Sequence, residues 1–356
     1  MSSEREIAEN GSEPKKRRRG RLRLAGIILL GLAGVLLLLA AIVFFAFKSG
    51  FADSYIKNQF VETLASMGVT FRAEKFALQA TPLALELENA EFYNSKTRQP
   101  LASIKKGRIE FTITDLFAWR LTREIRVEST ELNGAQFWII FDENGRSNFA
   151  DIVQTSGPSR INLKYESAAV KVINSAIHFG DGQRAISFDA ENVSADIAPA
   201  VDDSLFEEPR YQINIAGLSA TAVYETRRTE NIDFTIRAVA DSRGADIQDL
   251  RVDSPLGSAV LSGKISNWQS FEYDLNLDGS LDLAKTGYFL GLEAAVGGDG
   301  TFKGKLKGQG EDFRIEAELG SQKLILDNIL VKNLGSNISA TIRGAEYAAQ
   351  GKAFAD

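Results

Sequence analysis

From about Val69 onward, the sequence alternates apolar and polar residues with a period of two, and this pattern limits what the chain can fold into. The alternation is clearest in residues 83–88, 232–238, 271–277, 301–307 and 313–319. Successive side chains of a strand point to opposite faces of a sheet, so each segment is predicted to be a strand with one apolar and one polar face. Turn dipeptides are expected to separate strands at Asn144-Gly145, Asp181-Gly182 and Asp278-Gly279.

Roughly twenty such segments, spaced about eight to twelve residues apart, predict a mainly β, antiparallel meander. A sheet of this kind has to hide its apolar face by closing into a barrel, packing on a second sheet or curling into a trough. Barrels and sandwiches usually close within about ten strands, whereas here the alternation continues well beyond that number. We therefore expect an elongated, curled, trough-like sheet whose interior is either an apolar groove or a packed core.

Residues 24–47 contain no charged or strongly polar side chain. At about 1.5 Å per residue this segment forms a helix of roughly 36 Å, long enough to cross a hydrocarbon core of about 30 Å. It is longer than the roughly 7–15 apolar residues of a cleaved signal peptide, so we expect an uncleaved transmembrane helix. A basic cluster before it predicts a cytoplasmic N-terminus and an exported remainder. The cluster consists of Lys15, Lys16, Arg17, Arg18, Arg19, Arg21 and Arg23.

Five regions follow from these patterns. Residues 1–23 form a polar cytoplasmic tail and residues 24–47 the membrane span. Residues 52–67 are expected to form a short amphipathic helix, because apolar residues recur three to four apart and Gly68 follows as a stop signal. No other helix is expected outside the membrane. A Pro/Gly/Ser-rich segment near residue 154 divides the β structure into a region over 69–153 and a quasi-repetitive region over 161–356.

Composition excludes several classes of function. The first 24 residues carry a net charge of +4 and the whole chain −6, which leaves −10 for the remainder and argues against nucleic acid as a partner. The chain has no cysteine and a single histidine, so thiol catalysis, Cys-ligated metals and His-based triads are not expected. No nucleophile elbow, phosphate-binding loop or dinucleotide fingerprint is present. We therefore expect no enzymatic activity, no cofactor and no metal.

Two local features are better explained by structure than by chemistry. Residues 142–148 (DENGRSN) are similar to part of a calcium loop but lack its remaining ligands and its bidentate glutamate. A hairpin turn after a strand over 135–141 is expected instead. His178 alternates with Ile177 and Phe179 and is expected to face outward or to be hydrogen-bonded.

The succession of segments resembles the N-terminal region of the AsmA-like family, which includes TamB-like proteins and is related in architecture to bridge-like lipid transfer proteins. The resemblance rests on the single span, the short helix and a series of strands that ends in a D-x-x-G-x-x-N turn. The segments are Gly68–Phe71, Leu83–Leu87, Ile109–Ile113 with Asp115–Phe117, Ile125–Leu132, Ala135–Phe141 and Asp142–Asn148. The Gly-punctuated strands over 254–342 resemble the repetitive β region of the same proteins.

This resemblance implies a single-pass inner-membrane protein whose β trough projects into the periplasm. It implies a part in phospholipid transport between the inner and outer membranes and in outer-membrane homeostasis, with phospholipid acyl chains as the ligand. The alternation gives the residues expected to line the groove. They are Leu83, Leu85, Leu87, Ile109, Phe111, Ile113, Phe234, Ile236, Tyr273, Leu275, Phe313 and Ile315.

The length of the trough and the function of the protein each allow two interpretations. Roughly twenty strands about 4.8 Å apart give a trough of about 100 Å, which is shorter than the periplasm is wide. We therefore expect either a fragment of a longer protein or a short member that needs a partner. A second interpretation is a periplasmic scaffold that offers strand edges to nascent outer-membrane proteins or to an outer-membrane β-barrel partner. A fully packed interior would favour the scaffold, and an open groove would favour lipid transport.

Overall fold

The computed structural model describes residues 61–62, 64–80, 82–114, 123–152, 161–164, 168–200, 209–268, 270–310, 312–327, 329–343 and 346–355. The expected tail, the expected membrane span and the basic cluster lie outside these ranges, as do residues 52–60 and 63 of the expected amphipathic helix. Residues 61–62 and 64–66 are helical, and Gly68 follows with a φ of 84°, which fits its expected role as a stop signal. Within the described ranges, no helix is both long and apolar enough to cross a bilayer.

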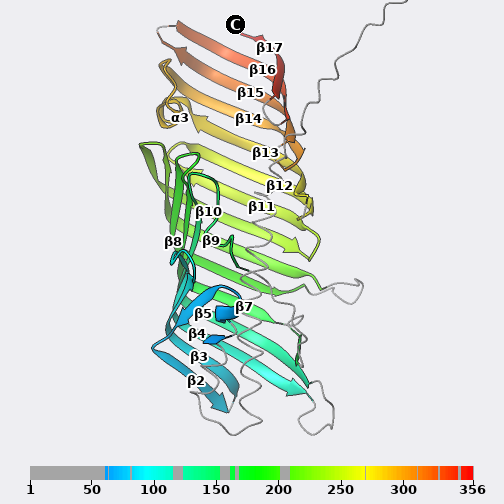
Figure 1. Ribbon diagram of the computed structural model, residues 1–356. Coiled ribbons are helices and arrows are strands. Elements are labelled where there is room, and N and C mark those ends of the chain that lie inside the picture. Colours follow the sequence, from blue (N-terminus) through cyan, green and yellow to red (C-terminus); the bar gives the residue numbers. More distant parts are fainter. Residues whose placement is uncertain are drawn as a thin grey trace, which may run out of the picture.

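The described part of the chain forms one long, open, curled sheet of seventeen strands (Figure 1). The strands are β1 (Val69–Arg72), β2 (Lys75–Ala80), β3 (Leu83–Asn94), β4 (Pro100–Thr114), β5 (Arg123–Phe141), β6 (Ile161–Lys164), β7 (Ala169–Asp181), β8 (Ile186–Pro199), β9 (Tyr211–Tyr224), β10 (Arg227–Ala240), β11 (Ala245–Ser254), β12 (Gly257–Asn267), β13 (Glu272–Asp282), β14 (Val296–Gln309), β15 (Asp312–Leu326), β16 (Ile329–Arg343) and β17 (Glu346–Phe354). The helix α3 (Leu283–Leu290) lies between β13 and β14.

Most strands pair antiparallel with the next strand in the sequence, as the meander requires. This holds from β2 to β5 and from β7 to β17. The expected antiparallel order is wrong at one place, because β6 and β7 both run parallel to β5. A parallel pair needs a crossover connection, and residues 142–160 supply the chain between β5 and β6. The sheet therefore continues across the Pro/Gly/Ser-rich segment.

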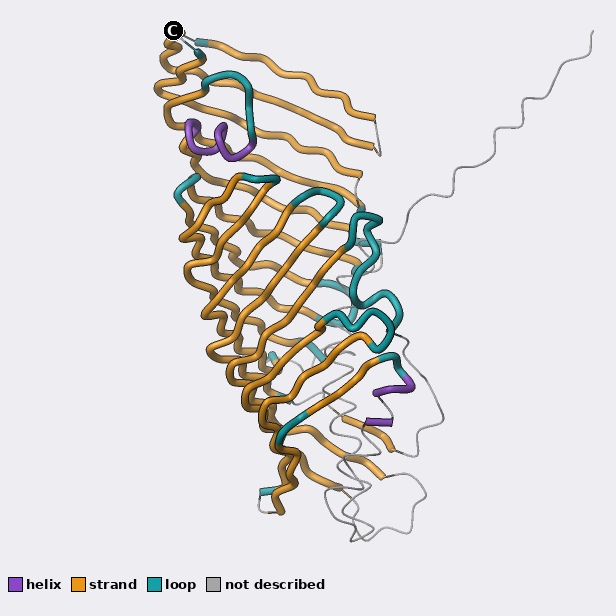
Figure 2. Tube along the Cα trace, turned by 60° about the vertical axis from the view of Figure 1, so that its left-hand side comes forward, coloured by secondary structure: helices purple, strands orange, loops and turns teal. Residues whose placement is uncertain are grey.

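Six strands bend at a residue with positive φ, and we call this line of bends the crease. It consists of Asn89, Gly134, Asn174, Asn192, Ser219 and Asn231, with φ between 46° and 65°. The pairing register skips at or beside these residues. Asn and Gly adopt this left-handed conformation more readily than other residues, and a bulge bends the strand that carries it. Figure 2 shows the strands bending along one side of the molecule.

The crease can be tested at Asn192, whose side chain is exposed and whose φ is 56°. A β-branched residue is strained in this conformation, so Asn192→Val is expected to lower the free energy of unfolding by about 1–2 kcal/mol. Asn192→Gly is the matched control and should change stability by less than about 1 kcal/mol, because glycine tolerates a positive φ. Denaturant unfolding of the full chain in detergent measures both. Equal effects of the two substitutions would contradict a role for the backbone conformation.

The crease divides β3 to β10 into two facing walls. The short wall contains β1 and one part of each creased strand, from residues 90–94 of β3 to residues 227–230 of β10. The long wall contains β2 and the other parts, and it continues through β11 to β17. Both walls contribute to two core clusters in the section formed by β1 to β10, which we call the base. There Phe71 of the short wall packs edge-on against Phe76 of the long wall, with ring centroids 6.3 Å apart.

Beyond β10 the architecture changes, and we call β11 to β17 the open section. Strand β11 pairs only with residues 233–240 of β10, which belong to the long wall. The short wall ends at the start of β10, and α3 packs there. The rings of Tyr224 and Phe289 lie 6.3 Å apart, and the Arg227 guanidinium lies against Gly291 at the end of α3. One helix therefore closes the edge at which the short wall stops.

Two expectations about local structure are wrong. The helix α3 was not expected, because it has only eight residues and contains Gly287. Its signals are at its ends, where Asp282 accepts a hydrogen bond from the Lys285 amide and Gly291 adopts a φ of 71°. Asp278-Gly279 was expected to be a turn, but both residues lie inside β13. Glycine is required there because the ring of Phe302 on β14 lies over it, and a Cβ would be 2.5 Å from that ring.

Candidate functional site: an open apolar groove

The apolar face of the long wall forms continuous rows that cross the open section. Cross-strand partners on one face lie close enough to contact each other, so the register defines the rows. The first contains Ile236, Leu250, Leu261, Leu277, Gly304, Ala317, Ile338 and Gly351. The second contains Ala238, Ile247, Gly263, Leu275, Leu306, Ile315, Ala340 and Ala349. The third contains Phe234, Val252, Ala259, Gly279, Phe302, Leu319, Ser336 and Ala353.

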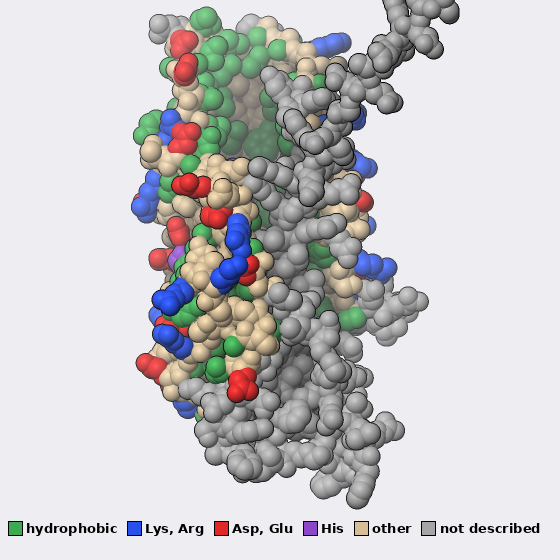
Figure 3. Space-filling model, in the orientation of Figure 1, with side chains coloured by type: hydrophobic (Ala, Val, Ile, Leu, Met, Phe, Trp, Pro, Cys, Tyr) green, Lys and Arg blue, Asp and Glu red, His purple; other side chains and the backbone are tan. Residues whose placement is uncertain are grey.

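These three rows carry no charged side chain, and Ser336 is their only polar one. They are also accessible. Of the apolar residues that are buried in the described part of the chain, only Tyr273 and Ala317 belong to β11–β17, each with 9% of its surface exposed. Leu319, in the third row, is 37% exposed. Figure 3 shows hydrophobic side chains gathered around a hollow in the part of the molecule formed by the last strands. We call this accessible apolar surface the open groove.

Glycines make room for aromatic rings on both faces of the open section. On the apolar face Phe302 lies over Gly279, and on the opposite face Phe354 lies over Gly335, where a Cβ would be 2.3 Å from the ring. In both cases the glycine and the aromatic residue are direct cross-strand partners. A ring that covers a backbone without a side chain keeps the lining apolar and adds no bulk at that position. The lining is therefore shallow and smooth at Gly279.

The opposite face of the same strands is charged. Lys303, Lys305 and Lys307 of β14 alternate with the apolar lining residues and face solvent. Lys303 lies 3.6 Å from Asp278, and Lys307 lies 3.5 Å from Asp274, both on β13. Such exposed pairs contribute little to stability. Their main consequence is that the sheet has one charged face and one apolar face.

The structure separates the expected lining residues into two groups. Leu85, Leu87, Ile109 and Phe111 belong to the packed core of the base and are at most 2% exposed, and Leu83 packs against that core. Ile113 belongs to β4, but its side chain lies outside the described part. Phe234 is partly buried at the upper end of the base. The others lie on the apolar face of the long wall: Ile236, Tyr273, Leu275, Phe313 and Ile315.

Several lining residues were not among those expected to line the groove. They include Leu250, Leu261, Leu277, Phe302, Leu306 and Leu319, which the register places in the same rows. Alternation had already placed Leu277, Phe302, Leu306 and Leu319 on the apolar faces of their strands. It could not have found Leu250, because a bulge shifts the register between Ile247 and Leu250. Tyr288 and Leu290 of α3 are 74% and 51% exposed.

The loop 142–148 ties the base together. Asp142 accepts hydrogen bonds from the amides of Asn144 and Arg146 and forms the expected turn. The buried Asn148 donates to the carbonyl oxygens of Pro100 and Trp138, both at 2.8 Å, and accepts from the Ile140 amide at 3.1 Å. These contacts join β4 and β5.

His178 is on the outward face, as expected, and both of its contacts are structural. Its ring stacks on Trp138 with centroids 5.2 Å apart. Its Nδ1 lies 2.8 Å from Asp189.

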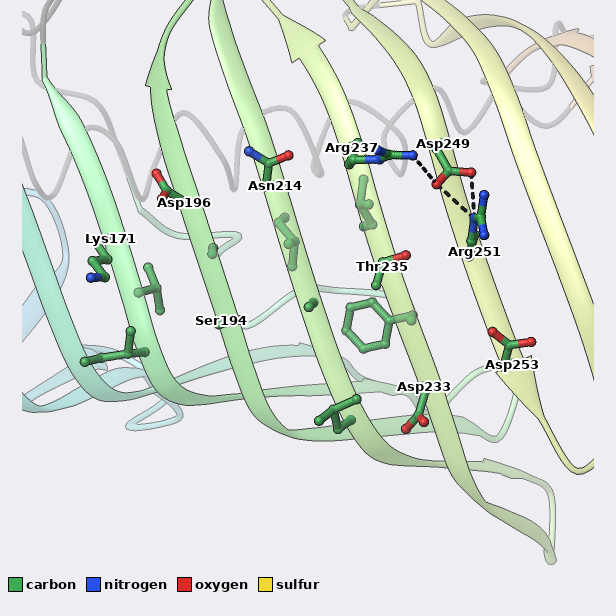
Figure 4. Close-up of a pocket in the computed structure, with 18 residues that line it drawn as sticks. Lys171, Ser194, Asp196, Asn214, Asp233, Thr235, Arg237, Asp249, Arg251 and Asp253 are labelled. Atoms are coloured by element: carbon green, nitrogen blue, oxygen red, sulfur yellow. Dashed lines mark hydrogen bonds and ion pairs between the residues drawn. The ribbon is translucent and has the colours of Figure 1, made fainter.

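A second concavity of about 730 Å³ lies on the polar face of β7 to β11 (Figure 4). Small side chains such as Ser194 and Ala216 form part of its lining. Asp249 is 13% exposed and accepts hydrogen bonds at 3.0 Å from both Arg237 and Arg251. Both carboxylate oxygens of Asp249 are occupied by the two arginines, and we favour the open groove as the functional site.

The ion pairs of Asp249 with Arg237 and Arg251 predict how the stability of the protein depends on pH. The hydrogen bond from Arg251, and after it the one from Arg237, lowers the pKa of Asp249 despite its partial desolvation. A depressed pKa in the folded state stabilises the fold above the unfolded pKa of about 3.9, and this stabilisation is lost as pH falls through the folded value. Asp249→Asn is therefore expected to destabilise the protein at pH 7, by a margin that shrinks towards pH 2. Unfolding measured at low salt tests this, with Asp253→Asn as control because Asp253 forms neither ion pair.

The described residues contain no cluster of His, Asp or Glu side chains that could hold a metal ion. No protein-family model matches the chain. A comparison with curated proteins also finds no match.

Proposed function

We propose that this protein binds the acyl chains of phospholipids in its open groove and takes part in phospholipid transport between the inner and outer membranes of a diderm bacterium. The N-terminal span anchors it in the inner membrane, and the sheet lies in the periplasm. The protein is not an enzyme, and the groove acts by shielding acyl chains from water.

The observation that carries this proposal is the set of apolar rows that are free of charge and yet accessible. Exposed apolar surface of this extent marks a binding site in a soluble protein region. An acyl chain placed on the rows removes both surfaces from water, which is worth about 0.8 kcal/mol for each buried methylene group. The charged opposite face offers no comparable gain, so lipid is expected on one face only.

The dimensions of the groove agree with a lipid ligand. The seven strands from β11 to β17 are separated by six spacings of about 4.8 Å, which gives a groove of roughly 29 Å. This length is close to the hydrocarbon thickness of a bilayer, about 30 Å, which is the length of two acyl chains placed end to end. The rows cross the strands, so a chain that follows a row lies along the long axis of the sheet.

Photocrosslinking in cells tests this function. A photoreactive phenylalanine analogue replaces Phe313, which is on the apolar face, and in a second variant replaces Arg314, the next residue on the charged face. Phospholipid adducts are expected at position 313 and not at position 314. Adducts at both positions, or at neither, would contradict a lipid-binding groove. The two positions are adjacent on one strand, so expression and membrane insertion are matched.

The alternative function, a scaffold for assembly of outer-membrane proteins with an outer-membrane barrel partner, gives a different result. Protein adducts at position 313 without lipid adducts would favour the scaffold. We prefer the lipid function because the open section has its apolar residues exposed, whereas a scaffold would need only strand edges.

A further inference from the structure

We propose that the lipid-accessible part of the apolar face begins at β11, and that Phe234, packed against Phe188, is its inner end wall. This inference rests on the proposed function and adds a limit to it. Acyl chains would reach the groove through the open section and not through the base, although the apolar rows of the long wall continue into the base.

The end wall is a contact between the two walls. Phe188 lies on the short wall, where it pairs with Ala222 of β9. Phe234 lies on the long wall, where it pairs with Gly217 of β9. Their ring centroids are 6.0 Å apart. Two aromatic side chains from opposite walls therefore meet, one on β8 and the other on β10, the last strand that has both walls.

Gly217 leaves the space that the Phe234 ring occupies. A Cβ at Gly217 would be 2.3 Å from the ring, so the ring lies directly over the glycine backbone. The next residue in the same row is Val252 on β11. Strand β11 pairs only with the long-wall part of β10, so Val252 is the first position of the row beyond the short wall. Phe234 thus stands at the boundary between the two-walled and one-walled parts.

The interior below the end wall is filled by the protein's own side chains. Ala190, Val193, Ala220 and Ile232 are at most 8% exposed, and they form one cluster with both phenylalanines. Further down, Leu87 and Leu132 are 1% and 2% exposed. Interiors packed in this way contain few voids larger than a water molecule. A methylene chain could enter only by displacing these side chains, so the base is closed to lipid.

Photo-leucine, incorporated throughout the full-length protein in cells, tests the limit without a bulky label. After irradiation, mass spectrometry of peptides locates phospholipid adducts at each leucine. Adducts are expected at Leu275 and Leu306 in the groove, at least tenfold above those at Leu87 and Leu132 in the base. Adducts of equal abundance in the base would overturn the limit and leave the proposed function standing. Absence of adducts at Leu275 and Leu306 would overturn the proposed function and the limit with it.

The role of Phe234 needs a reporter just below it. Ile215 lies on the long wall within reach of the same cluster, and Ile215→Leu places a photoreactive leucine there with little change in volume. Adducts at position 215 are expected to be absent when Phe234 is present and to appear with Phe234→Ala. Phe188→Ala, which removes the other half of the contact, should have the same effect. Retained adducts at Leu275 show that each variant is folded, and an unlabelled position 215 in both would overturn the end wall.

Discussion

Replacing Phe111 with alanine is expected to lower the free energy of unfolding by about 3–5 kcal/mol, as large-to-small changes of buried aromatic residues do. Phe111 is 2% exposed and belongs to the core cluster of the base. The substitution removes apolar surface that both walls cover, and the crease holds the walls at a fixed separation, so the cavity cannot collapse fully. Denaturant unfolding of the full chain in detergent, followed by circular dichroism, measures the change.

Phe313→Ala is the matched control because it removes the same side chain from the open section. Phe313 is only partly buried, so the expected loss is about 1 kcal/mol, less than that for a fully buried ring. The lipid readout should change in the opposite sense: Phe313→Ala should weaken lipid crosslinking at neighbouring lining residues, and Phe111→Ala should not do so while the protein stays folded. Equal stability losses for the two variants would contradict the division into a closed base and an open section.

Replacing Asn148 is expected to have the second large effect, a loss of about 3 kcal/mol or more for Asn148→Asp. Asn148 is 1% exposed, and its side-chain amide donates to the carbonyl oxygens of Pro100 and Trp138. A carboxylate of the same size cannot donate these hydrogen bonds and places a buried negative charge beside two carbonyl oxygens. The bond accepted from the Ile140 amide would survive.

The same unfolding measurement checks Asn148, and Asn276→Asp is its control. Asn276 is exposed on the charged face of β13, opposite Lys305, so its replacement should change stability by less than about 0.5 kcal/mol. The loss at Asn148 should grow as pH rises from 4 to 7, because the new carboxyl group is neutral only at low pH. A loss that does not depend on pH would show that the missing donors, and not the charge, decide the effect.

Much of the local structure could be predicted from the sequence. Alternation with a period of two is a local consequence of strand geometry, so the strands around residues 83–88, 271–277 and 313–319 and their apolar faces were identified correctly. The turns at Asn144-Gly145 and Asp181-Gly182 and the outward position of His178 follow from the same local rules. The parallel placement of β7 beside β5 could not be predicted, because strand pairing across a long connection leaves no local pattern.

For the candidate site, the sequence predicts which face of each strand is apolar but not which part of that face is exposed. Leu85 and Leu319 occupy equivalent positions in the alternation, yet Leu85 is fully buried and Leu319 is 37% exposed. The alternation of apolar and polar residues around the two leucines is the same, so this pattern does not distinguish them. The difference in exposure arises because the part of β3 that contains Leu85 faces the short wall. β15, which contains Leu319, belongs to the open section, where no second wall covers the sheet.

The sequence by itself determined which residues form strands and which face of each strand is apolar, because both depend on the backbone geometry of neighbouring residues. Only the tertiary structure decided where the apolar face is covered. The crease at Asn89, Gly134, Asn174, Asn192, Ser219 and Asn231 folds the first strands into two walls, and this line of bends stops at β10. Burial depends on what lies across the interior, and residues distant in the sequence provide it. The same alternating pattern therefore forms a packed core in the base and an open groove above it.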